Sequence, residues 1–125
     1  DSEIFNQRND YLKKITEEIN RRYGNNAASI KISIQYRNLG EAIKKVPFMI
    51  PNLVKAIEMA GITPHKVAFR GGTDGSALSW RGLPCPNLSA GYENAHGRFE
   101  YVPVQSMSKN VEILLNLADL YSQQK

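Results

Sequence analysis

The first part of the chain contains two different hydrophobic periods. From Ile4 to Tyr23, apolar side chains recur at three- and four-residue spacing, which predicts an amphipathic α-helix that ends at Gly24. From Ile30 to Tyr36, apolar and polar residues alternate, which predicts a half-buried β-strand. A single strand cannot form a stable sheet, so we expect this segment to be part of a larger α+β unit.

The pattern changes around residue 45, where we expect a domain boundary. The second segment alternates predicted strands and helices, which favours an α/β fold. The predicted elements are a helix over 51–60, a strand over 66–70, a short helix from Ser76, a strand over 99–104 and a last helix that Ser106 caps.

Composition excludes several classes of protein. The chain has 125 residues, of which 42% are hydrophobic, enough for one compact unit. Its net charge of +4 comes from scattered Lys and Arg residues, a pattern that does not favour a nucleic-acid partner. No apolar run approaches the roughly 20 residues of a membrane span.

The single cysteine, Cys85, fits a reducing, cytoplasmic location better than a secreted one. Because Asp1 and not Met comes first, we expect the natural start to lie upstream.

The residues that could carry chemistry form an ordered set of short motifs. They read RGGTDGS over 70–76, GLPCPN over 82–87, NAHG over 94–97 with Glu100 close behind, and VQSM over 104–107. The glycine-rich turn alone is weak evidence, since it lacks the Lys-Ser/Thr ending of a P-loop. Together, the motifs resemble the carboxy-terminal end of the tripeptide aminopeptidases in the zinc-dependent M20 metallopeptidase family. The resemblance covers residues 66–121 and, more loosely, the helix and strand before them.

This resemblance implies a catalytic domain with two zinc ions and an inserted lid domain, the type that also mediates dimerisation. Residues 1–45 would be part of the lid, and residues 46–125 the carboxy-terminal segment of the catalytic domain. In the family, a histidine just before the last strand of the catalytic domain binds zinc, and that position corresponds to His96. A neutral imidazole nitrogen is an ordinary zinc donor.

Five further residues are candidates for supporting roles. Glu100 is either a carboxylate that orients His96 or bonds its loop, or a surface glutamate, and Asn94 is expected to hold that loop. Thr73, Asp74 and the neighbouring glycines resemble the family loop beside the active site, and Thr73 is a candidate peptide contact. Arg70 is expected to reach either the peptide or a structural carboxylate, and the sequence does not decide between them. For Asp74, capping of the short helix is the preferred interpretation.

One histidine cannot form a two-zinc site, which needs several protein ligands and a bridging carboxylate. The resemblance implies that the parent protein hydrolyses short peptides, and the donor count leads us to expect that this piece alone is inactive. Its expected partners are the peptide substrate, the missing amino-terminal part of the same chain and, in a homodimer, a second copy. The alternatives are a non-catalytic, lid-like binding or dimerisation module and, ranked lower, an inactive relative of the enzyme.

Overall fold

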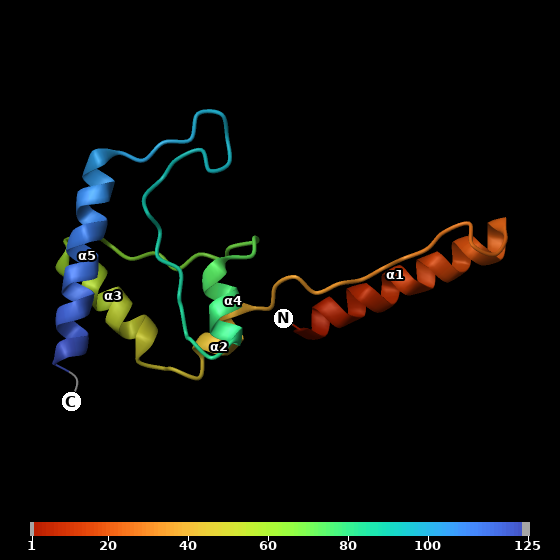
Figure 1. Cartoon of the computed structure of the whole chain (residues 1–125), viewed down its shortest axis with the longest axis horizontal. Coiled ribbons are helices and arrows are strands. Elements are labelled where there is room, and N and C mark those ends of the chain that lie inside the picture. Colours follow the sequence, from red (N-terminus) through yellow and green to blue (C-terminus); the bar gives the residue numbers. More distant parts are fainter. Residues whose placement is uncertain (1, 124–125) are drawn as a thin grey trace. The chain divides into compact units, whose positions relative to one another are not determined.

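The computed structural model describes residues 2–123 and is mainly helical (Figure 1). The helices are α1 (Ser2–Tyr23), α2 (Leu39–Ile43), α3 (Met49–Met59), α4 (Asp74–Trp80) and α5 (Val104–Ser122). The chain divides into a first unit that ends at Asn38 and a second that begins at Leu39. None of the helices in the described part of the chain combines the length and the apolar character that a membrane crossing requires.

The expected α/β fold, with its α+β amino-terminal unit, is wrong. The structure is 52% helix and 2% strand, with no sheet among residues 2–123. Segments 30–36 and 66–70 have no regular secondary structure, and the expected strand over 99–104 is reduced to one isolated bridge, Glu93 to Tyr101. Alternating polarity indicates an extended, half-exposed segment, but a strand also needs a neighbour to pair its backbone groups. The described residues supply no such neighbour.

The first unit is α1 followed by an extended segment. Helix α1 has no buried side chain. Past its end, Gly24 has a φ of +101°, a conformation in which glycine has no steric penalty. The Asn20 amide then donates to the Ala28 carbonyl (3.0 Å) and accepts from the Ala28 N–H (2.9 Å), so both groups of Ala28 are tied to the last turns of α1.

The core of the second unit lies where α3 packs against α5 (Figure 1). Ala56 is 0% and Ala60 1% exposed, and these small side chains let the two helices approach closely. Leu53 and Ile113 complete the buried cluster. Partly buried apolar side chains surround it: Ile57, Leu88, Leu117 and Leu120.

Polar side chains of α5 fasten the end of α3. The Lys109 ammonium donates to the Ala60 carbonyl (2.7 Å), and the Asn116 amide donates to the Ala56 carbonyl (3.2 Å). The Ala56 carbonyl also accepts from the Ala60 N–H (3.3 Å), whereas the Ala60 carbonyl lies past the helix, so the Lys109 bond satisfies a group that would otherwise need water. Gly61, with a φ of +74°, ends α3 as the sequence predicted.

Helices α2 and α4 pack together beside the glycine-rich turn. Helix α4 begins after Thr73, whose hydroxyl accepts a hydrogen bond from the Ser76 N–H (3.2 Å). The cap is therefore Thr73 and not Asp74, which occupies the first helical position. A Cβ at Gly75 would lie 2.7 Å from the Cys85 carbonyl oxygen, so the glycine allows the 85–87 segment to pass close to the helix.

Candidate functional site

The expected metal ligand lies in a closed loop, residues 93–101, which we call the His96 turn. Its two ends are joined by paired backbone bonds: Glu93 N–H donates to the Tyr101 carbonyl (2.9 Å), and Tyr101 N–H donates to the Glu93 carbonyl (3.3 Å). The loop is thus anchored at its base.

At its tip, the His96 turn folds into a tight turn over Asn94 to Gly97. The Gly97 N–H donates to the Asn94 carbonyl (2.8 Å), and the third residue, His96, has a φ of +60°. Positive φ at the third position is the pattern of a type II turn. A Cβ at Gly97 would lie 2.8 Å from the Asn94 oxygen, so this position requires glycine.

Two side chains hold this backbone from within the turn. The Glu100 carboxylate accepts a hydrogen bond from the His96 backbone N–H at 2.7 Å. The Asn94 amide donates to the Phe99 carbonyl at 3.3 Å. Asn94, His96 and Glu100 are therefore brought together in one turn, and Glu100 contacts the His96 backbone and not its ring.

The described residues can supply one ligand to a metal ion, but not a complete set of ligands. His96 is exposed, so its imidazole is open to a ligand. Across residues 2–123, no group of three or more His, Cys, Asp and Glu side chains is arranged to hold a metal ion. A zinc site needs several such donors, so further ligands would have to come from other polypeptide.

The second candidate segment, 70–73, is not joined to the first. Arg70 is exposed, and Thr73 is half-buried with its hydroxyl engaged as the α4 cap. Among the described residues, no hydrogen bond or ion pair links either side chain to the His96 turn.

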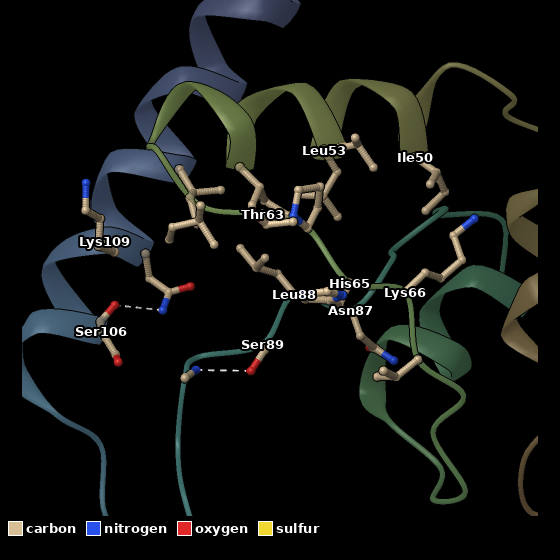
Figure 2. Close-up of a pocket in the computed structure, with 18 of the residues that line it drawn as sticks. Ile50, Leu53, Thr63, His65, Lys66, Asn87, Leu88, Ser89, Ser106 and Lys109 are labelled. Atoms are coloured by element: carbon tan, nitrogen blue, oxygen red, sulfur yellow. Dashed lines mark hydrogen bonds between the residues drawn. The ribbon is translucent and has the colours of Figure 1, made fainter.

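The structure also contains a pocket that sequence patterns did not indicate. It measures about 700 Å³ and lies between α3, α5 and the segments 62–67 and 87–91 (Figure 2). Apolar side chains dominate its lining: Ile50, Leu53, Val54, Ile57, Ile62, Val67, Leu88 and Ile113. Periodicity predicts that α3 and α5 have apolar faces, but not that these loops leave a hollow beside them.

Several polar groups around this pocket serve the chain's own backbone. Ser89 accepts from the Gly91 N–H (3.1 Å), and Asn110 donates to the Ser106 carbonyl (2.9 Å) (Figure 2). Lys109 donates to the Ala60 carbonyl at the end of α3 (2.7 Å). His65 is exposed and borders the pocket. The exposed imidazole of the motif set lies in the His96 turn and does not line this pocket, so the turn is the candidate for metal chemistry.

Comparison with known proteins gives a consistent result, although no family model matches the chain. It is 38% identical over 121 residues to the peptidase T of Caldanaerobacter subterraneus, which covers 97% of this chain. It is 41% identical over 123 residues to the peptidase T of Clostridium perfringens and 42% identical over 122 residues to that of Clostridium botulinum, each covering 98% of this chain. The chain is a homologue of part of peptidase T.

The similarity to peptidase T includes the His96 turn, both helices of the core and the glycine-rich turn. The chain spans 30% of the length of each of these relatives. This agrees with a carboxy-terminal segment of peptidase T. It also favours a piece of a peptidase over a non-catalytic binding module.

Proposed function

We propose that this chain is the carboxy-terminal portion of a two-zinc aminopeptidase that removes amino-terminal residues from short peptides, tripeptides above all. The observation that carries the proposal is the His96 turn, an exposed imidazole in a tightly bonded loop within a chain similar to peptidase T over 97–98% of its length. The complete enzyme would comprise this catalytic segment, a lid to which residues 1–45 belong, and the amino-terminal part.

His96 would contribute one ring nitrogen to the metal centre, as a neutral donor. Zinc in such a centre supplies an activated water and polarises the peptide carbonyl. The Glu100 carboxylate and the Asn94 amide would act on the loop that presents the imidazole, since ligand loops depend on such outer contacts. The remaining ligands and the general base would come from the rest of the polypeptide.

Arg70 and Thr73 are proposed as peptide contacts. Arg70 carries an exposed guanidinium whose fork geometry matches a carboxylate, the group at the carboxyl end of a tripeptide. Thr73 already accepts a bond from Ser76, but its hydroxyl proton can still donate to a peptide oxygen.

The proposal also covers the cellular compartment and the protein partners of the complete enzyme. A single cysteine fits a reducing, cytoplasmic compartment. The expected partners are the rest of the polypeptide and a second copy, since α1 has no buried side chain and several of its large apolar residues are exposed, among them Phe5 (43%) and Leu12 (45%). Light scattering on the complete protein would distinguish a dimer from a monomer.

The decisive variant is His96→Ala in the complete protein. Loss of one donor should reduce bound zinc, measured by elemental analysis, and lower tripeptide turnover by at least about 100-fold. Losing a group that only hydrogen-bonds a metal ligand already costs up to about 100-fold, and loss of a ligand itself should cost at least as much. His65→Ala is the matched control, because it removes the chain's other histidine, which lies outside the turn. Unchanged zinc content and kinetics in His96→Ala would remove this residue from the site.

A further inference from the structure

The four-residue turn over Asn94 to Gly97 gives the His96 N–H no backbone acceptor. The bond from Gly97 to Asn94 closes the four-residue turn and involves neither the N–H nor the carbonyl of His96. The His96 N–H instead donates to the Glu100 carboxylate at 2.7 Å. A second turn, closed by the bond from Glu100 N–H to the Gly97 carbonyl (3.2 Å), brings the Glu100 side chain back to that N–H.

The conformation of His96 makes this bond consequential. Its φ of +60° belongs to the left-handed region, which a residue with a Cβ occupies only when its surroundings favour it. If His96 returned to an ordinary negative φ, its side chain and the residues that follow would rotate about the N–Cα bond, and the Glu100 carboxylate would move away from the His96 N–H. A carboxylate that holds the N–H therefore also fixes the direction in which the imidazole leaves the backbone.

From this geometry we infer that Glu100 is a positioning residue, which acts through the His96 backbone N–H to select the left-handed conformation that presents the imidazole to its metal. The inference rests on the proposed role of His96 as a ligand. It differs from the usual arrangement, in which a carboxylate accepts a bond from the ligand's other ring nitrogen.

The test uses the complete protein and compares Glu100→Ala with Glu100→Gln. Glu100→Ala removes the acceptor and should weaken zinc binding about 10- to 100-fold, measured by competition with a chelator. Glu100→Gln keeps an acceptor oxygen without the charge, so zinc affinity should be restored to within about threefold of the unaltered protein. The remaining loss is expected because a neutral hydrogen bond is only about half as strong as a charge-assisted one. Glu93→Ala removes a carboxylate from the same turn that takes no part in the bond and should match the unaltered protein.

A second measurement does not depend on the metal. In the zinc-free protein, amide exchange at His96 should accelerate in Glu100→Ala and stay near the unaltered rate in Glu100→Gln, with circular dichroism checking that helix content is unchanged. Unchanged exchange in Glu100→Ala, unchanged zinc affinity in that variant, or a Gln variant as weak as the Ala variant would each overturn the inference. If His96→Ala lowers zinc content while Glu100→Ala does not, only the positioning role fails; if His96→Ala keeps its zinc, the proposed function fails.

Discussion

At the scale of single residues, the His96 turn contains two backbone conformations that residues with a Cβ rarely adopt. Asn94 and His96 have φ values of +56° and +60°. A left-handed residue with a Cβ costs about 1–2 kcal/mol, somewhat less for Asn, whose side chain bonds locally. The bond that Glu100 accepts and the bond that the Asn94 side chain donates, at about 1 kcal/mol each, are of the size needed to offset that cost.

Gly97→Ala should loosen this turn. The added Cβ would lie 2.8 Å from the Asn94 oxygen, a backbone atom that cannot move without breaking the bond between Gly97 and Asn94. We expect a local destabilisation of about 1–3 kcal/mol and a lower zinc content in the complete protein. Amide exchange across 93–101 and elemental analysis would measure both.

Arg98→Ala is the control for Gly97→Ala. It alters an exposed neighbour whose guanidinium lies over the Phe99 ring (5.6 Å) and makes no bond that closes the turn. If Gly97→Ala exchanged its amides at the same rate as Arg98→Ala, the close contact at residue 97 would have no energetic consequence.

The sequence motifs indicated Asn94, His96 and Glu100 as a group, and the structure places all three in one turn. The bond from the His96 N–H to Glu100 was not predictable, because it depends on a positive φ at residue 96, and a histidine in the sequence does not predict a positive φ. Thr73 shows the same limit. Both Thr73 and Asp74 are good capping residues, and only the extended backbone of Thr73 decides between them.

At the scale of elements, helical periods were the reliable signal and alternating polarity was not. The predicted helices were confirmed as α1, α3, α4 and α5, and the first three end just before a glycine with positive φ. The predicted Ser106 cap was wrong, because α5 already begins at Val104, after Pro103. The three predicted strands were wrong, because pairing depends on distant backbone that a local pattern does not contain. The five-residue α2, Leu39–Ile43, was missed because it is too short to show a period.

Thr73→Ala should fray the start of α4. It removes the oxygen that accepts the Ser76 N–H (3.2 Å), and loss of such a cap costs about 1 kcal/mol. Amide protection at Ser76 in the complete protein should therefore fall about fivefold, while Thr73→Ser keeps the hydroxyl and should retain protection. Equal protection in the Ala and Ser variants would show that the cap contributes nothing to α4.

At the scale of the whole molecule, the described chain buries few of its apolar side chains. The buried cluster between α3 and α5 contains two alanines, one leucine and one isoleucine. By contrast, Val111, Leu114 and Leu115 on α5 are 58%, 55% and 62% exposed. Large exposed apolar surface usually marks a contact with other protein. This agrees with a chain that spans 30% of the length of peptidase T relatives.

Purified alone, the chain of 125 residues should show no tripeptide hydrolysis above background, with or without added zinc. The physical reason is the donor count: His96 offers one imidazole, residues 2–123 hold no group of three or more potential ligands, and zinc chemistry requires both a filled ligand set and a general base. Release of amino-terminal residues, followed by chromatography, would measure this, with the complete protein as positive control. Circular dichroism must show the helices of Figure 1, so that inactivity reflects missing ligands and not an unfolded chain. Hydrolysis by the purified piece, abolished by His96→Ala, would mean that it assembles a catalytic centre by itself, against the donor count.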